Sequence, residues 1–264
     1  LVCLLSRSGR VDGASEDRWK RVRNAYGARV RVVQCDVSDA GEVRAAFGLV
    51  EEAMRGVGAT CVGIVHAAGV LRDGLLRGQS AGAFEEVLAP KVRGLAGCMW
   101  SVLGRQRVCD AVSFSSVTGF LGNRGQSNYA FANGQVDALS RFYGAVGLPG
   151  KSVQWGAWAD VGMAASSGAA SAFAEVGFGL LGVDQGLECL EAALMMRGGS
   201  VVCCSPMHWQ QYFSRHSAAR PAAFVSKFIE QSDCGSTGST PSIFSGFAQR
   251  LAQLNLHDRV VLLE

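Results

Sequence analysis

Six short apolar runs, rich in β-branched residues, recur along the chain, and segments with helical spacing separate them. The runs begin near residues 1, 30, 61, 111, 151 and 200. Antiparallel strands can be joined by tight turns, whereas parallel strands need crossover connections of a dozen or more residues, usually helices. Helices between successive strands therefore predict an α/β fold, in which a doubly wound parallel sheet carries helices on both faces.

The segments between these runs carry helix signals of their own. We expect one helix over residues 15–26, with Ser15 as its cap, and a second, amphipathic helix capped by Ser38. A longer helix is expected over residues 79–103, and Pro90 should bend it because proline removes a helical hydrogen bond.

Composition excludes several classes of function. Of the 264 residues, 48% are hydrophobic and 18% charged, which suits a sizeable core and argues against disorder. The net charge of +3 is too small to indicate a nucleic-acid or acidic-membrane partner, and no apolar run is long enough to span a membrane. The nine cysteines include no C-x-x-C pair, so core thiols in a reducing compartment are favoured over disulfides or a metal site. The cytoplasm or an organelle would provide that compartment.

The stretch from Phe114 to Phe142 holds the candidate chemistry. Ser115 and Ser116 end an apolar run, Tyr129 follows thirteen residues after Ser116, and Asn133 comes four residues later. A spacing of four places Tyr129 and Asn133 on the same face of a helix. A Ser at a strand end and a Tyr at a helix start can hold a carbonyl oxygen between two O–H groups. Reduction of a ketone needs this arrangement, because charge grows on the oxygen before it is protonated.

This stretch resembles the active site of the ketoreductase domains of modular polyketide synthases, within the short-chain dehydrogenase/reductase superfamily. Most of that superfamily has Lys four residues after the Tyr. These ketoreductases have Asn there and carry the Lys upstream, in a K-V-x-G segment. This chain has Asn133 after Tyr129 and Lys91 in KVRG, and the resemblance runs from Leu1 to about residue 230.

The resemblance implies a role for each of these residues. Tyr129 would be the general acid and Ser116 the second donor to the oxyanion. Lys91 would lower the pKa of the Tyr129 phenol by stabilising the phenolate. Asn133 would order the water or backbone contacts of a proton relay.

Other interpretations of the same residues exist. Serines at strand ends usually cap helices or form turns, and a helical Tyr usually buries its ring and exposes its hydroxyl to water. Any of the four residues alone would be read in this structural way, whereas all four in order favour a reductase site. At the level of the whole protein, the alternatives are a non-catalytic structural module of a synthase and a free-standing reductase of small ketones.

Cofactor binding is also implied by resemblance. Leu1 corresponds to the start of the family's second strand, so we expect the first strand, the first helix and the Gly-rich turn that cradles the pyrophosphate to be missing. That loss would leave the sheet with an unpaired edge. Ser6 and Arg7 follow this strand, and Arg7 would meet the 2′-phosphate of NADPH with a planar, charge-assisted fork. Alternatively, Arg7 is only a surface residue in a turn.

Further positions along the chain match the family's cofactor site. Asp36 and Val37 would lie along the adenine, and Gly156 beside the nicotinamide. The three small residues after the next strand would contact the nicotinamide ribose; they are Ala67, Ala68 and Gly69.

Two more features concern the substrate. Asp73 occupies the last position of a motif, usually L-D-D, that correlates with the configuration of the product hydroxyl, and Leu121 stands where the opposite class has Trp. Both features resemble B-type ketoreductases, which form the D-configured hydroxyl. The segment 162–182, rich in Gly, Ala and Ser, suits a lid over the substrate entrance.

The expected organisation is a ketoreductase domain over residues 1–230, a Ser/Gly/Thr linker over 231–241, and the start of a helical domain over 242–264. The last segment resembles the lead-in to an acyl carrier domain. The resemblance implies NADPH-dependent reduction of a β-ketoacyl thioester to a β-hydroxyacyl thioester, in a polyketide or fatty acid synthase. The partners would be an acyl carrier protein domain, with the acyl chain on its phosphopantetheine, and the neighbouring synthase domains.

Overall fold

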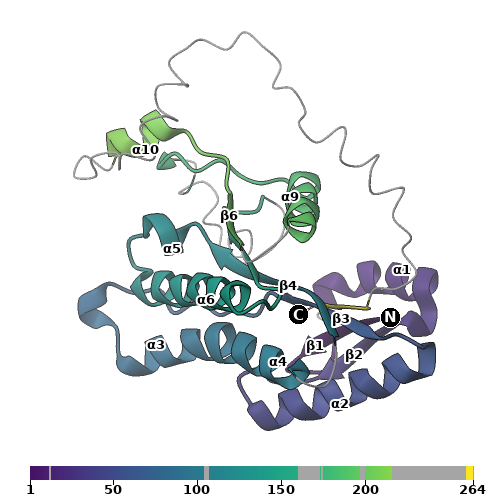
Figure 1. Cartoon of the computed structure of the whole chain (residues 1–264). Helices are drawn as coiled ribbons and strands as arrows, with labels where there is room; N and C mark the ends of the chain where they lie inside the picture. Colours follow the sequence, from purple (N-terminus) through teal and green to yellow (C-terminus); the bar gives the residue numbers. More distant parts are fainter. Residues whose placement is uncertain are drawn as a thin grey trace. The chain divides into compact units, whose positions relative to one another are not determined.

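The computed structural model describes residues 1–11, 13–103, 107–159, 173, 175–196, 200–215 and 260–263 (Figure 1). The expected linker, most of the expected lid and most of the carrier-like segment lie outside these residues. Two compact units divide the chain. Unit 1 comprises Leu1–Gln154, Ala193–Val202 and Leu256–Glu264, and unit 2 comprises Trp155–Ala192 and Cys203–Asn255.

A seven-stranded sheet forms the frame of the fold, with the strand order β2-β1-β7-β3-β4-β5-β6. The pairs β1–β2, β1–β7, β3–β4 and β3–β7 are all parallel. All six predicted strands are present, although β4 begins four residues earlier than its apolar run suggested. The strands are β1 (Val2–Ser6), β2 (Val30–Gln34), β3 (Cys61–His66), β4 (Arg107–Ser116), β5 (Lys151–Trp155), β6 (Ser200–Cys204) and β7 (Val260–Leu263).

The seventh strand corrects two expectations. Val260–Leu263 was expected to be helical, and β1 was expected to present an unpaired edge. Instead β7 lies between β1 and β3, pairing Val2 with Val261 and Val62 with Val260 (Figure 1). A run of four apolar residues fits a strand with neighbours on both sides as well as a helix, so tertiary context decides between them.

Helices connect the strands much as the spacing predicted. In Figure 1, α1 lies on one face of the sheet, and α2 and α4 lie on the other. The helices of unit 1 are α1 (Glu16–Tyr26), α2 (Ala40–Val57), α3 (Ala81–Leu88), η4 (Ala89–Arg93), α4 (Gly94–Val102), α5 (Thr118–Leu121) and α6 (Ser127–Ala145), with three short 3₁₀ turns at Gly13–Ser15, Gly27–Arg29 and Leu76–Gly78. Two later helices are α9 (Val183–Met195) and α10 (Trp209–Arg215). None of the described helices is long and apolar enough to cross a membrane.

The helix caps differ from the prediction. Ser15 stands at the start of α1, but its side chain makes no capping hydrogen bond. The cap of α2 is Asp39 rather than Ser38: the Asp39 carboxylate accepts from the backbone N–H groups of Gly41 and Glu42. Ser38 instead donates its backbone N–H to Asp36, in the turn that follows β2.

The main hydrophobic core lies between the sheet and the helices α2, α4 and α6. Cys3 and Leu5 alternate along β1 and point into this core, where they meet residues such as Val43 of α2 and Met99 of α4. The core therefore fixes α6 against β4, and this contact positions the candidate site.

Candidate active site

Ser116 and the predicted cofactor residues of unit 1 lie at or just after the carboxyl ends of strands, whereas Lys91 lies on η4 and Tyr129 and Asn133 lie on α6. Because the strands are parallel, their carboxyl ends meet at the same edge. The chain moves outward from β1 to β2 and then crosses to β3, on the far side of β7. A crevice at such a reversal of strand order is where open α/β sheets bind their ligands.

Ser116 and Tyr129 converge at the end of β4. Ser116 is the last residue of β4, and its Oγ accepts the Thr118 backbone N–H at 3.2 Å. Tyr129 lies in the first turn of α6, and each of the two side chains is only 8% exposed. Hydrogen bonding with the Ser116 side chain acts on the Tyr129 phenol and favours its ionised form.

Lys91 reaches this site from an irregular turn. The helix predicted over 79–103 is interrupted by the π-helical turn η4, which contains Pro90 and Lys91. Such turns inside helices frequently mark functional sites. The Lys91 side chain is buried, its Nζ donates to the Phe114 carbonyl oxygen at 2.9 Å, and Nζ lies 5.2 Å from the centroid of the Tyr129 ring.

Asn133 completes the group of four. It lies one turn after Tyr129 on α6, fully buried, and its Nδ2 donates to the Tyr129 carbonyl oxygen at 2.8 Å. Ser115 Oγ donates to the Asn133 carbonyl oxygen at 3.3 Å, which ties β4 to α6. Within the described residues, Asn133 Oδ1 is buried and has no hydrogen-bond partner. A buried acceptor without a partner is uncommon and indicates a place for a water or ligand donor.

Burial has the largest effect on the pKa values of Lys91 and Tyr129. Burial lowers the pKa of Lys91 to about 8, although attraction from Asp137 opposes the effect. The pKa of Tyr129 is raised by burial, while hydrogen bonds with Asn133 and Ser116 lower it and Asp73 raises it further. The sequence predicted that Lys91 would lower the pKa of Tyr129. In the structure desolvation outweighs the stabilising contacts, so the net direction is upward.

The residues expected near the adenine end lie at the ends of β1 and β2. Ser6 ends β1, and its Oγ lies 3.2 Å from Ser8 Oγ in the turn that follows. Arg7 is exposed and lowers the pKa of the Asp36 carboxyl, after larger contributions from Ser38 hydrogen bonds. The two side chains therefore lie within electrostatic reach of each other. Val37 is buried against Gly94, where any larger residue would collide with it.

The small residues after β3 leave room beside Lys91. Ala67, Ala68 and Gly69 follow β3 directly, and a Cβ on Gly69 would come within 3.0 Å of Lys91 Cε. Gly156 belongs to unit 2, where its N–H donates to the Cys204 carbonyl oxygen at 2.8 Å. A Cβ on Gly156 would collide with Ser205, so packing alone accounts for glycine there.

A hydrogen-bond network fixes the loop that carries Asp73. Gln126, three residues before Tyr129, donates Nε2 to Asp73 Oδ2 at 3.0 Å. Asn128 donates to the Arg72 carbonyl oxygen at 2.7 Å, and Gly74 donates its N–H to the Gly125 carbonyl oxygen at 2.8 Å. These contacts join the segment after β3 to the start of α6. Sequence reasoning missed Gln126 and Asn128, because polar residues at the start of a helix are ordinarily solvated.

Comparison with known proteins identifies the family. Residues 1–160 match the family model described as "KR domain". The chain belongs to the ketoreductase (KR) domain family of modular polyketide synthases. This KR chain is 35% identical to the polyketide synthase GfsA of Streptomyces halstedii over 257 residues, which are 96% of the chain and 3% of that protein.

Solved ketoreductases share the fold of this KR chain. PlmKR1, the ketoreductase from the first module of phoslactomycin biosynthesis in Streptomyces sp. HK803, is 32% identical with a TM-score of 0.73. The match covers 86% of this chain and 50% of that one. The first ketoreductase of the tylosin polyketide synthase is 30% identical with a TM-score of 0.66, over 83% of this chain and 46% of that one. These matches confirm the predicted α/β fold and the family resemblance.

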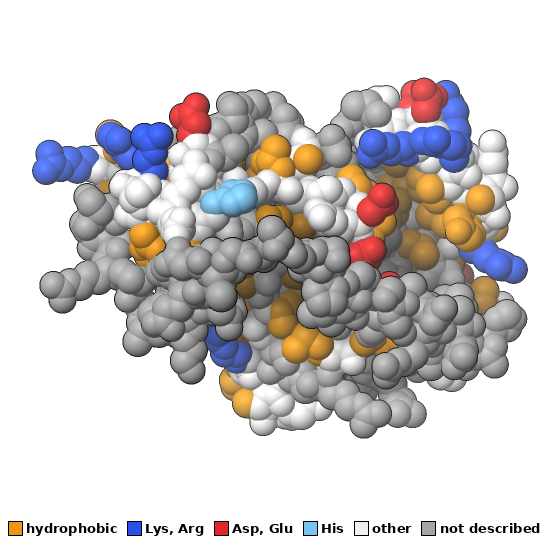
Figure 2. All heavy atoms as spheres, turned by 90° about the horizontal axis from the view of Figure 1, so that it is seen from above, with side chains coloured by type: hydrophobic (Ala, Val, Ile, Leu, Met, Phe, Trp, Pro, Cys, Tyr) orange, Lys and Arg blue, Asp and Glu red, His pale blue; other side chains and the backbone are white. Residues whose placement is uncertain are grey.

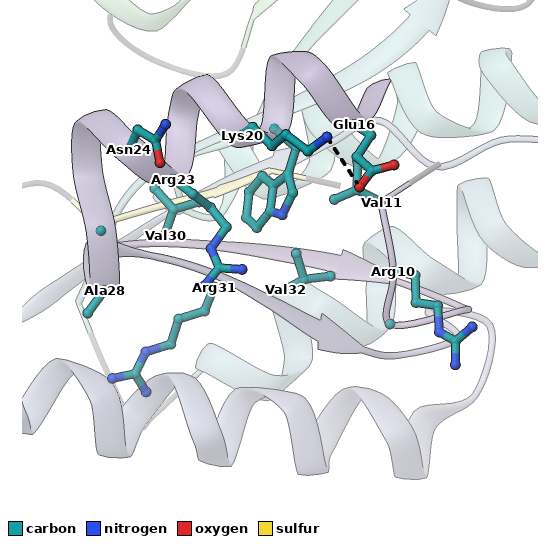
Figure 3. A pocket seen from close by; sticks show the side chains of 13 residues that line it. Arg10, Val11, Glu16, Lys20, Arg23, Asn24, Ala28, Val30, Arg31 and Val32 are labelled. Atoms are coloured by element: carbon teal, nitrogen blue, oxygen red, sulfur yellow. Dashed lines mark ion pairs between the residues drawn. The ribbon is translucent and has the colours of Figure 1, made fainter. Parts of the chain in front are cut away.

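A pocket of about 900 Å³ lies between α1, the turn that follows β1, and β2, and none of the four candidate catalytic residues lines it (Figure 3). Trp19, Val30 and Val32 contribute apolar surface, and the basic residues Arg23 and Arg31 also line the pocket. Figure 2 shows basic side chains bordering hydrophobic ones toward the right of the view, where α1 lies. This pocket opens under a helix that has no buried residue, so it marks loose packing of α1.

Unit 2 contains a glycine pattern that the sequence analysis did not single out. Gly177, Gly179 and Gly182 have the spacing G-x-G-x-x-G and precede α9. The pattern needs a preceding strand to bind a dinucleotide, and no described strand ends there. Gly177 adopts a φ of +92° against Tyr212, and Gly179 packs against Pro206. Close packing within unit 2 therefore explains these glycines. Within the described residues, no group of His, Cys, Asp or Glu could hold a metal ion.

Proposed function

We propose that the chain carries out NADPH-dependent reduction of a carrier-bound β-ketoacyl thioester to a β-hydroxyacyl thioester. The observation that carries the proposal is the convergence of Ser116, Tyr129 and Lys91 at the end of β4, in a chain of the KR family. Two hydroxyl groups and a buried cation around one small volume suit a carbonyl whose oxygen becomes an anion.

The protein's own residues would supply the proton and hold the oxygen. When bound, NADPH supplies the hydride that adds to the β-carbonyl carbon. Tyr129 and Ser116 donate hydrogen bonds to the carbonyl oxygen, and Tyr129 transfers its proton to that oxygen as the C–O double bond is reduced. The raised pKa of Tyr129 keeps the phenol protonated at neutral pH, which a general acid requires.

Proton return to Tyr129 would pass through Lys91 and Asn133. The Lys91 ammonium has three N–H donors, and one is bonded to the Phe114 carbonyl oxygen. The remaining donors can hold the cofactor's ribose or a relay water. Asn133 Oδ1, buried and unpartnered among the described residues, suits an acceptor for that water.

The residues present fit part of the cofactor. Exposed Arg7, beside Ser6 at the end of β1, suits a 2′-phosphate, and Gly69 leaves space next to Lys91 for the nicotinamide end. The described edge between β1 and β3 offers no Gly-rich turn for the pyrophosphate. In the family that this chain resembles, the Gly-rich turn precedes the strand that corresponds to β1.

We further propose that this reaction takes place within a synthase, on an acyl chain borne by the phosphopantetheine of a carrier domain. The chain spans 3% of GfsA and about half of the solved ketoreductases that it matches, so the remaining synthase domains would be its partners. The resemblance of Asp73 and Leu121 to the B-type ketoreductases supports a D-configured hydroxyl in the product.

Tyr129→Phe tests the reaction and its acid. In the protein with its natural flanking sequences, we expect β-keto reduction to fall by roughly 10²–10⁴-fold, the usual contribution of a general acid, with little change in NADPH affinity. The measurement is NADPH oxidation coupled to detection of the β-hydroxyacyl product.

Tyr143→Phe is the matched control. Tyr143 lies on the same helix and is equally buried. The substitution Tyr143→Phe therefore removes the same hydroxyl group at a position away from the site. We expect its reductase activity to stay within about threefold of wild type. An inactive wild-type protein that still binds NADPH would instead favour the non-catalytic structural module. Full activity of Tyr129→Phe would refute the assignment of the acid.

A further inference from the structure

Asp137 lies on the catalytic face of α6 and has no role in the reaction described above. It follows Asn133 by one helical turn and Tyr129 by two, so the three residues share one face. Its side chain is 4% exposed. Ser152 Oγ donates to Asp137 Oδ1 at 2.6 Å, and Gln154 Nε2 donates to Oδ2 at 2.7 Å. Both donors are neutral, so they satisfy the carboxylate's hydrogen bonds without cancelling its charge.

The buried charges of unit 1 indicate what Asp137 balances. Buried Lys151 has its own carboxylate partner, Asp110, at 3.0 Å. Buried Lys91 donates to a neutral carbonyl oxygen and forms no salt bridge with any described residue. A buried charge is costly unless an opposite charge compensates it. Among the described residues, Lys91 is therefore a buried lysine without a salt bridge, and Asp137 is a buried carboxylate without one.

We propose that Asp137 is a positioning residue for Lys91: its carboxylate is the counter-charge that keeps the Lys91 ammonium charged beside Tyr129. This inference rests on the proposed function, in which the charged Lys91 serves Tyr129. Attraction from Asp137 is the one influence that raises the pKa of Lys91 against the larger effect of burial.

Other titratable groups around η4 are accounted for. On α6 the other groups are Tyr129 itself, the exposed Arg141, and Tyr143, which is buried in the main core. On β3, His66 Nε2 bonds with the Lys91 carbonyl oxygen at 3.1 Å, away from Nζ. On α3, Glu85 and Glu86 are both exposed and pair with Arg93 and Arg72 respectively. The remaining packed helix, α4, carries no acidic or basic residue and contributes only the thiol of Cys98.

Removal of the counter-charge has a defined direction. Asp137→Asn would lower the pKa of Lys91 further below about 8, so the ammonium would be lost at a lower pH. The alkaline limb of the kcat/KM profile would move to lower pH. We expect kcat/KM to fall roughly fivefold to tenfold at about pH 8 and to stay within about twofold at about pH 6. A merely structural role would lower activity similarly at both values.

The experiment measures reduction of a soluble β-ketoacyl thioester with NADPH across this pH range, in the protein with its natural flanking sequences. Asp137→Glu keeps the charge and should retain the wild-type alkaline limb.

Asp137→Ser is a second neutral variant, for use if Asp137→Asn fails to fold. It removes the charge but leaves room for water beside Ser152 and Gln154. The matched control is Asp110→Asn, which removes the partner of the other buried lysine and should not move the limb. An unchanged limb in a neutral Asp137 variant would overturn the inference.

A second readout separates this inference from the proposed function. Competitive acetylation of Lys91 with acetic anhydride, followed by mass spectrometry, gives the pH at which its amine becomes neutral without any need for turnover. We expect this midpoint to be lower in Asp137→Asn than in wild type. If the wild type does not reduce the substrate but the midpoint is still lower in Asp137→Asn, only the reductase assignment is overturned. Equal midpoints would overturn the role of Asp137.

Discussion

Arg7 is the residue on which the choice between NADPH and NADH depends. It is exposed at the end of β1 and lies within electrostatic reach of Asp36. A guanidinium can bond a 2′-phosphate with two parallel hydrogen bonds, whereas NADH has only a hydroxyl at that position. Arg7→Ala should therefore weaken NADPH binding by roughly tenfold or more and NADH binding only slightly. Titrations followed by nicotinamide fluorescence would measure both affinities.

Arg10→Ala is the control for this prediction. Arg10 lies three residues further along the same turn and is also exposed, but its side chain lines the pocket under α1. It should change neither affinity by more than about twofold. If Arg7→Ala weakens the binding of NADPH and of NADH equally, Arg7 is only a turn residue and does not select the cofactor.

At the scale of single residues, the sequence predicted what local spacing determines. Tyr129 and Asn133 share a helix face because four residues separate them, and the structure places them so. Lys91 depends on a π-helical turn that no spacing rule predicts, and only the family resemblance pointed to it. Asp137 was missed because its partners, Ser152 and Gln154, come from a strand fifteen or more residues away.

At the scale of elements, the start of α2 offers a test of the fold. Asp39 accepts hydrogen bonds from two backbone N–H groups of the first turn, which otherwise lack helical partners. Asp39→Ala should lower the free energy of unfolding by about 0.5–2 kcal/mol, the usual value of such a cap. Chemical denaturation followed by circular dichroism would measure the change.

Ser38→Ala provides the comparison, because the sequence favoured Ser38 as the cap. We expect a smaller loss than for Asp39→Ala, since the Ser38 side chain bonds to Asp36 and not to the helix. The opposite ranking would show that the cap is misassigned. Ser and Asp are equally good N-cap residues, so residue type does not distinguish Ser38 from Asp39. The backbone conformation after β2 determines which of the two stands at the start of α2.

At the scale of the whole molecule, β7 is the element that sequence reasoning did not anticipate. Strand order follows from pairing between distant segments, and nothing near Val260 in the sequence encodes its neighbours. Because β7 lies between β1 and β3, the backbone N–H groups of its residues should be hydrogen-bonded on either side. Hydrogen–deuterium exchange of the peptide spanning Val260–Leu263 should therefore be slow, comparable to that of β3. Exchange as fast as that of an unstructured peptide would contradict this strand.

The central claim is that hydride passes from NADPH to the β-carbon of an acyl thioester bound beside Tyr129. Transfer of label tests it most directly. The protein with its natural flanking sequences is incubated with NADPH deuterated at the reactive C4 position and a β-ketoacyl thioester, and the product is analysed by mass spectrometry. We predict a β-hydroxyacyl thioester that carries one deuterium on the carbon bearing the hydroxyl, formed roughly 10²–10⁴-fold more slowly with Tyr129→Phe under single-turnover conditions. A product without deuterium, or unchanged substrate in the presence of bound NADPH, would contradict the account.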